Sequence, residues 1–170
     1  MRYKRGYKKD VVKREVTPSE AADKLMVLCS RGERCCYDAI RLMTRWGVDA
    51  QAQRDIVDML VEQRYIDQER YTHAFVEDKI RFSGWGDYKI RAALRAKRID
   101  DELIDAAIEL FSDSDERHRR LVEMLSYKKR GINAKNDYDL KGKLLRFAAS
   151  RGFGYEEALN AIEEVVKDDM

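Results

Sequence analysis

The sequence predicts an all-α protein built from three tandem repeats of three helices. One observation is composition: the 170 residues include one Pro and nine Gly, with 39% charged and 44% hydrophobic residues, a balance typical of solvated helices. A second is that apolar residues recur three and four positions apart, as on one face of a helix. A third is that one apolar pattern occurs three times along the chain, which indicates a repeat architecture.

The repeat is defined by Val48, Ile99 and Phe153, which occupy equivalent places in three segments. Five further apolar columns lie nine and five residues before these positions and eight, nine and twelve residues after them. The columns are Ala39, Ile90 and Leu144; Met43, Leu94 and Ala148; Ile56, Ala107 and Ala161; Val57, Ile108 and Ile162; and Leu60, Phe111 and Val165. Amphipathic helices in unrelated register would not share so many columns.

The elements follow in order from a helix start at Thr17, where Thr17, Pro18 and Glu20 form the pattern of a capping box. Nine helices are expected, near residues 18–30, 33–46, 49–63, 67–82, 87–97, 100–112, 115–129, 137–151 and 155–167. We therefore expect a basic, flexible tail over 1–16 and repeats over 17–64, 65–113 and 114–170.

The tail is strongly basic, because residues 1–14 hold seven Lys or Arg and one Asp. Tyr3 and Tyr7 alternate with these cations, a pattern that suits an arm following a phosphate backbone and stacking on bases. A tail that only improves solubility would have the same composition, so both interpretations stay open.

Further basic residues gather on two of the predicted helices. Lys89, Arg91 and Arg95 lie on the polar face of the helix expected at 87–97, and Lys128 and Lys129 close the helix expected at 115–129. Each group taken alone is also explained as a solvated face or as favourable charge at a helix C-terminus.

No pattern for catalysis, a cofactor or a metal is present. Gly84-Trp85-Gly86 lacks the third glycine and the preceding strand of a dinucleotide site, and His73 and His118 lack a second ligand at helical spacing. The three cysteines indicate neither a disulfide framework nor a zinc site. No apolar run is long enough to cross a membrane or to serve as a signal peptide, so a cytoplasmic protein that is not an enzyme is expected.

The segment from about residue 60 to 110 resembles the central motif of the RecX family, whereas the flanking repeats match by pattern only. The resemblance includes an acidic and aromatic helix start, an aromatic-Val pair, a Gly-aromatic-Gly turn, a basic-Ile pair and a final Ile. The motif residues are Asp67, Arg70, Tyr71, Phe75, Gly84, Trp85, Gly86, Ile90, Leu94 and Ile99. The two glycines would free the backbone for a turn, with Trp85 packed under it. Arg98 stands where the family usually has Gly, so we expect that helix to end without a left-handed residue.

The resemblance implies an elongated, curved and monomeric array that lodges in the groove of a RecA–single-stranded-DNA filament. There it would modulate, and usually inhibit, ATP hydrolysis, recombination and filament growth, within homologous recombination, DNA repair and the SOS response. Duplex DNA is a further candidate ligand. The cations expected to contact the filament or DNA are Lys4, Arg5, Lys8, Lys9, Arg81, Lys89, Arg91, Arg95, Lys128 and Lys129.

Two other functions stay open at this point. A helical nucleic-acid-binding module acting without RecA would bind DNA or RNA alone with a steep salt dependence. An adaptor between proteins would show no such dependence and would bind through an apolar patch.

Overall fold

The computed structural model describes residues 16–111 and 113–167, and these residues form nine α-helices without strands. The predicted all-α helical repeat is thereby confirmed. The helices are α1 (Pro18–Arg31), α2 (Cys36–Arg45), α3 (Ala50–Glu62), α4 (Gln68–Arg81), α5 (Asp87–Ala96), α6 (Asp101–Phe111), α7 (Ser114–Lys129), α8 (Asp137–Arg151) and α9 (Tyr155–Lys167). The basic tail expected over 1–16 lies outside the described residues, apart from Val16, which packs against the first core.

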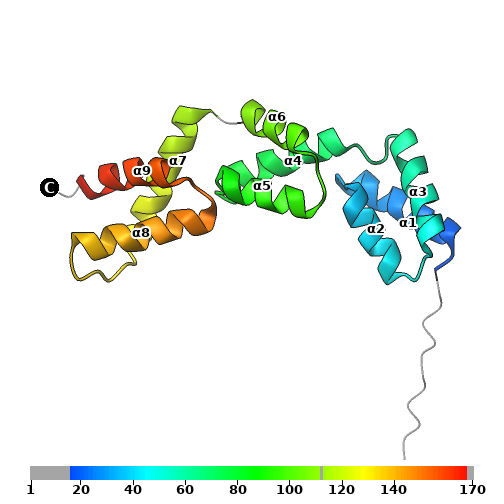
Figure 1. Ribbon diagram of the computed structural model, residues 1–170, viewed down its shortest axis with the longest axis horizontal. Coiled ribbons are helices and arrows are strands. Elements are labelled where there is room, and N and C mark those ends of the chain that lie inside the picture. The colour runs from blue at the N-terminus through cyan, green and yellow to red at the C-terminus, as the bar shows by residue number, and fades with distance from the viewer. Residues whose placement is uncertain (1–15, 112, 168–170) are drawn as a thin grey trace, which may run out of the picture.

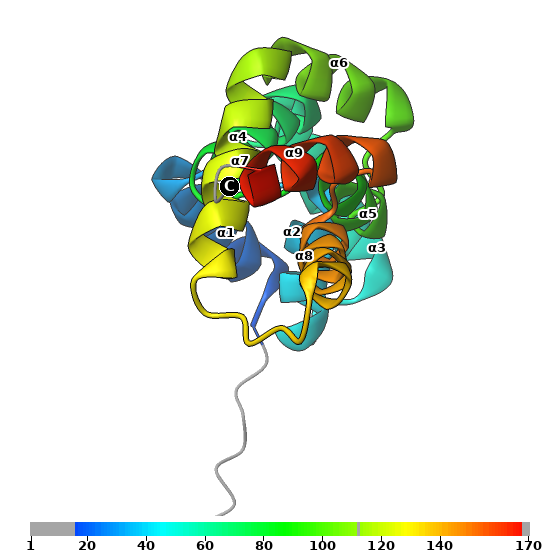
Figure 2. The ribbon, with the colours of Figure 1, turned by 90° about the vertical axis from the view of Figure 1, so that its left-hand side faces the viewer.

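The helices group in threes along an elongated molecule (Figure 1). In each group the first and second helices both pack against the third, and each group has its own buried apolar cluster. Viewed from the end that carries α7, α8 and α9, the other groups lie behind them (Figure 2). We propose residues 17–64, 65–113 and 114–170 as the three repeats, and the separate clusters support this division.

The repeat columns form the centre of each cluster. Ala39, Ile90 and Leu144 are fully buried, and so are the residues of the column four positions later in the chain. The last column is less uniform, since Phe111 is only partly buried. The sequence periodicity thus marks the face by which each helix meets its own triplet.

The second helix of every triplet ends in the same left-handed stop. Gly47, Arg98 and Gly152 have φ values of 82°, 59° and 91°. The next residue in each case donates its N–H to the carbonyl five positions back, at 3.1, 3.2 and 3.2 Å, which is the hydrogen bond of a Schellman motif. Each stop places the following apolar residue, such as Ile99, in its core.

The expectation for Arg98 is therefore wrong: α5 does end with a left-handed residue, and that residue is an arginine. A side chain in this conformation costs about 1 kcal/mol. Burial of Ile99 and its hydrogen bond to Leu94 impose the turn. The Arg98 guanidinium also lies 5.9 Å from the centre of the Tyr37 ring, a contact that offsets part of the cost.

Candidate functional site: the two repeat junctions

The junction between the first and second repeats, here the first junction, begins at the N-terminus of α4. Asp67 caps α4 by accepting the N–H of Arg70 at 2.9 Å. The Arg70 side chain then reaches back to Glu33 in the first repeat, with Nε to Oε1 at 2.6 Å. Gln68 accepts the N–H of Cys36 at 3.2 Å through its Oε1. The acidic and Arg-containing start of the motif therefore joins two repeats rather than only starting a helix.

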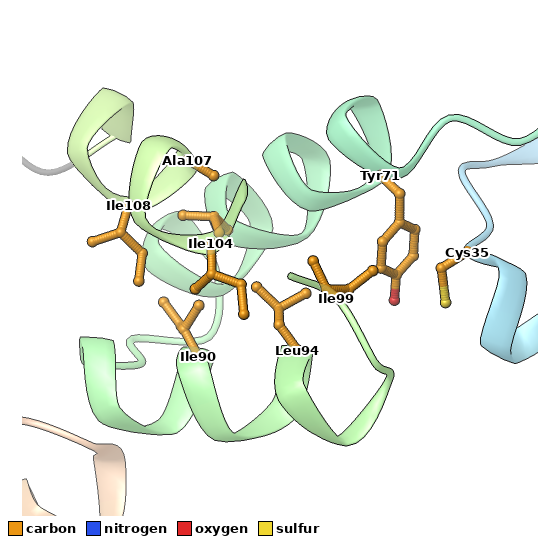
Figure 3. Close-up of a cluster of buried hydrophobic side chains, with 9 residues drawn as sticks. Cys35, Tyr71, Ile90, Leu94, Ile99, Ile104, Ala107 and Ile108 are labelled. Carbon is orange, nitrogen blue, oxygen red and sulfur yellow. The ribbon is translucent and has the colours of Figure 1, made fainter. Parts of the chain in front are cut away.

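The buried part of the first junction is formed by Cys35 and Tyr71. Cys35 precedes α2 in the first repeat, yet its side chain belongs to the core of the second, where it faces the Tyr71 ring (Figure 3). Extended backbone at Cys35 starts α2 at Cys36, three residues later than predicted, which leaves Glu33 in the loop to meet Arg70.

An ion pair covers this buried contact. Lys97 donates through Nζ to both carboxylate oxygens of Asp38 at 2.6 Å, and it lies 5.7 Å from the centre of the Tyr71 ring. Burial and the nearby Cys35 raise the pKa of Tyr71 to about 12, although Lys97 opposes the shift. Burial lowers the pKa of Lys97, but hydrogen bonds to Asp38 and Tyr71 outweigh it, and the net shift is upward.

The junction between the second and third repeats, here the second junction, is centred on Gly84-Trp85-Gly86. Gly84 has a φ of 60°, which turns the chain between α4 and α5. Trp85 packs edge-on to Phe75, with ring centres 6.4 Å apart. The Lys89 ammonium group lies over the Trp85 ring, 4.7 Å from the ring centre. This turn presents the start of α5 to the third repeat.

At the second junction the backbones themselves are hydrogen-bonded. Gly86 donates its N–H to the carbonyl of Arg151 at 2.9 Å, and Tyr88 donates to the carbonyl of Gly152 at 3.1 Å. No side chain caps α5, so these carbonyls from the end of α8 satisfy two of the N–H groups that its first turn leaves free. The negative end of one helix dipole thereby meets the positive end of another, which is favourable.

This approach is possible only with glycine on both sides. A Cβ on Gly86 would lie 2.3 Å from the Gly152 oxygen, and one on Gly152 would lie 2.4 Å from the Lys89 Cβ. Gly152 also holds a left-handed conformation, so it meets two separate requirements. Gly86 is therefore needed for a contact with another repeat, beyond the turn for which the sequence predicted it.

Arg117 of α7 links three helices at the second junction. Its guanidinium donates to Asp87 of α5 at 2.6 Å and to both oxygens of Glu157 of α9, at 2.7 and 2.8 Å. A planar guanidinium suits such a multiple contact because its donors are fixed in a fork. No pattern in the sequence marks Arg117 as a junction residue, and the same is true of Glu33, Asp38 and Gly152. Their contacts are with residues that are remote in the chain.

The motif residues therefore divide among three roles. Asp67, Arg70 and Tyr71 build the first junction, and Phe75, Gly84, Trp85 and Gly86 build the second. Ile90, Leu94 and Ile99 lie in the core between them. The motif thus joins the second repeat to both of its neighbours.

Six of the ten cations expected to contact the filament lie among the described residues, and all six have partners within the protein. Arg81 pairs with Glu77 at 2.6 Å, Arg95 pairs with Asp101 at 2.6 Å, and Arg91 pairs with Asp105. Lys89 donates to the Ser150 carbonyl at 3.2 Å, Lys128 lies 5.2 Å from the Phe147 ring centre, and Lys129 donates to the Val165 carbonyl at 2.9 Å. Lys4, Arg5, Lys8 and Lys9 lie outside the described residues. Their contacts with a filament stay predictions.

Within residues 16–111 and 113–167, no cluster of three or more His, Cys, Asp or Glu side chains is placed to hold a metal ion. None of the described helices is both long enough and apolar enough to cross a membrane.

The fold and the junctions define a helical-triplet protein whose middle unit is joined to both neighbours. Residues 67–108 match the family model described as RecX, second three-helix domain. The regulatory protein RecX of Chromohalobacter salexigens is 31% identical over 151 residues, covering 87% of this chain and 92% of the relative. That of Clostridium botulinum strain Alaska E43 is 30% identical over 154 residues, covering 89% and 68%. The chain belongs to the RecX family of regulatory proteins.

Two solved structures share the fold. A crystal structure of regulatory protein RecX superimposes with a TM-score of 0.76 at 20% identity, covering 89% of this chain and 73% of the other. RecX from Lactobacillus salivarius gives a TM-score of 0.70 at 19% identity, covering 88% and 97%. At these identities the likeness concerns the fold.

Proposed function

We propose that this protein binds a RecA–single-stranded-DNA filament and modulates, most often by inhibition, its ATPase, recombinase activity and growth. In this proposal the protein is a monomeric, cytoplasmic regulator that catalyses no reaction and needs no cofactor. Its setting would be homologous recombination, DNA repair and the SOS response. Family membership supports a regulatory role, and the structure supplies a physical basis for the choice of a filament.

The observation that carries the proposal is the coupling of three units into one elongated surface. A filament repeats its protomers along an axis, so a ligand that spans several of them needs a long surface in a fixed geometry. The motif residues of the two junctions hold neighbouring repeats together by ion pairs and by backbone hydrogen bonds. A loosely linked chain of triplets would lose binding energy by ordering its units on the filament.

The paired cations are compatible with this proposal. Exposed ion pairs such as Arg81 with Glu77 and Arg95 with Asp101 are worth about 0 to 1 kcal/mol. An arginine in such a pair can therefore exchange its carboxylate for a phosphate at low cost. Part of the filament affinity would then depend on salt.

The test is the DNA-dependent ATPase of the cognate RecA, measured with this protein at substoichiometric ratio. The wild-type chain should lower the rate, and Gly86→Ala should act only at higher concentration because its Cβ would clash with Gly152. Gly32→Ala is the matched control, since its Cβ would enter open space on extended backbone. An unchanged rate with the wild-type chain, together with no co-sedimentation on filaments, would refute the proposal.

A module that binds nucleic acid without RecA is the second candidate, and the unpaired cations of α8 described below favour it. Such a module would bind DNA in the absence of RecA. It would lower the ATPase rate of RecA only by competing with RecA for DNA. Saturating the reaction with excess single-stranded DNA distinguishes the two, because competition for DNA would then disappear while a filament effect would persist.

A further inference from the structure

The third repeat carries a hollow of about 640 Å³ between the first half of α8 and the start of α9. It combines two exposed tyrosines with several cations, and none of these residues was among the predicted contacts. The residues used in the argument are Lys135, Tyr138, Lys141, Lys143, Arg146 and Tyr155.

The two tyrosines offer their rings to solvent. Tyr138 is 88% exposed and Tyr155 is 65% exposed, although both line the same hollow. They come from the first turns of α8 and α9, so two different helices hold them. Exposed aromatic faces beside cations are the arrangement on which unpaired bases stack.

The charge of the hollow is unbalanced. Asp139 is the one acid among the lining residues, and Lys143 holds it at 2.8 Å while the Lys135 N–H donates to it at 3.0 Å. These two hydrogen bonds lower the pKa of Asp139, and the nearby charge of Arg146 adds to the shift. Within residues 16–111 and 113–167, no carboxylate lies within ion-pair distance of the Lys135, Lys141 or Arg146 side chains. The α5 cations differ, since Arg91 and Arg95 both have acidic partners.

We propose that this hollow binds single-stranded nucleic acid, with bases stacked on Tyr138 and Tyr155 and phosphates contacted by Lys141 and Arg146. A polyanion fits because the lining holds four Lys or Arg residues but one acid, and three of these cations form no ion pair with another described residue. An unpaired strand fits better than a duplex because only unpaired bases expose their faces for stacking. The inference deepens the proposed function by naming a face that would meet DNA, and it is tested without RecA so that each can fail alone.

The first experiment measures fluorescence anisotropy of a labelled oligo(dT) with the full-length chain. Replacing both rings (Tyr138→Ala with Tyr155→Ala) should weaken binding roughly tenfold or more, since each stacked base contributes substantially. Tyr127→Ala is the matched control, because Tyr127 is 78% exposed on α7 and lies outside the hollow. Equal affinity of the double variant and the control would overturn the proposal.

The second experiment measures salt dependence. Lys141→Gln with Arg146→Gln should reduce the slope of log K against log salt by about 1.4, roughly 0.7 for each phosphate contact with a single strand. Arg31→Gln with Arg54→Gln removes two exposed charges from the first repeat and should leave the slope nearly unchanged. Equal slopes for the two double variants would contradict the proposal.

Two competitors identify the ligand. Unlabelled oligo(dT) should displace the probe and a duplex of equal charge should do so less well. Displacement by a poly-glutamate peptide as efficient as by oligo(dT) would assign the hollow to an acidic protein instead and overturn the proposal. If the tyrosine variant loses DNA binding but still inhibits the ATPase, the hollow is supported and the filament contact lies elsewhere.

Discussion

The two junctions of this protein hold neighbouring repeats together by different physical means. The first depends on side chains: Glu33 with Arg70, and Asp38 with Lys97 over the buried Tyr71. The second adds backbone contacts to the ion pair of Arg117 with Asp87, because N–H groups at the start of α5 bond to carbonyls at the end of α8. Ion pairs are screened by salt and tolerate small displacements. Backbone hydrogen bonds between closely packed glycines are less sensitive to salt, and they leave little room for displacement. We infer that the first junction is the softer one.

The largest expected effect comes from Gly152→Ala at the second junction. The new Cβ would lie 2.4 Å from the Lys89 Cβ on left-handed backbone, and we expect a loss of about 3 kcal/mol of unfolding free energy in urea denaturation. Gly47→Ala is the control, since it shares the left-handed stop but would meet open space. It should cost about 1 kcal/mol. Equal losses would mean that the backbone contact contributes nothing.

The next effect is alkaline weakening of the first junction through Tyr71. Its folded pKa is about 12, above the ordinary value of 10.0, so the folded chain retains a proton that the unfolded chain loses. Its contribution is complete below pH 10 and declines as the pH rises toward 12. By pH 11, one pH unit above the ordinary pKa, the loss should be about 1 to 2 kcal/mol.

This decline is measured as the difference between the wild-type chain and Tyr71→Phe in urea titrations from pH 9 to 11. Phe keeps the ring in the core but has no proton to lose. The wild-type chain should therefore lose stability faster with pH than the variant. Parallel curves would show that Tyr71 ionises equally easily in both states.

A smaller effect is expected from Asp38→Asn, which removes the charge facing Lys97. Both side chains are about one quarter exposed, at 22% and 26%, so solvent screens part of the interaction. We expect a loss of about 1 kcal/mol at low salt and less at 1 M salt. A double-mutant cycle with Lys97→Met isolates the pair. A salt-independent loss would contradict the electrostatic account of this junction.

The smallest effect is a gain from Arg98→Gly. Glycine removes the cost of the left-handed conformation at the end of α5, but it also removes the contact with Tyr37 and adds freedom to the unfolded chain. The net result should be about 0.5 kcal/mol of added stability in the same urea assay. A clear destabilisation would mean that the Tyr37 contact at the first junction is stronger than its distance indicates.

The repeats could be predicted from the sequence because their cause is local. Core residues such as Met43, Leu94 and Ala148 belong to apolar residues spaced three or four positions apart in their own helices. This pattern is visible without any long-range information. The left-handed stop at Arg98 could not be read in this way. The residue type argued against it, and only the packing of Ile99 imposed it.

The junctions could be predicted only in part. Resemblance to the family marked Arg70 and Gly86, but nothing nearby in the sequence identified Glu33 as the partner of Arg70 or Gly152 as the neighbour of Gly86. Because 39% of the residues are charged, each arginine has many acidic residues as possible partners in the sequence. Which ion pair forms is decided by how the triplets pack against one another. The same limit applied to the α8 hollow, whose tyrosines come from two helices.

The meeting of α8 and α5 has a mechanical consequence. Because carbonyls at the end of α8 accept from N–H groups at the start of α5, the two helices meet at the boundary between units (Figure 1). Displacing the end of α8 would break these hydrogen bonds or displace the start of α5 with it. A ligand that shifts the end of α8 would thus act on the middle unit as well as on the third repeat.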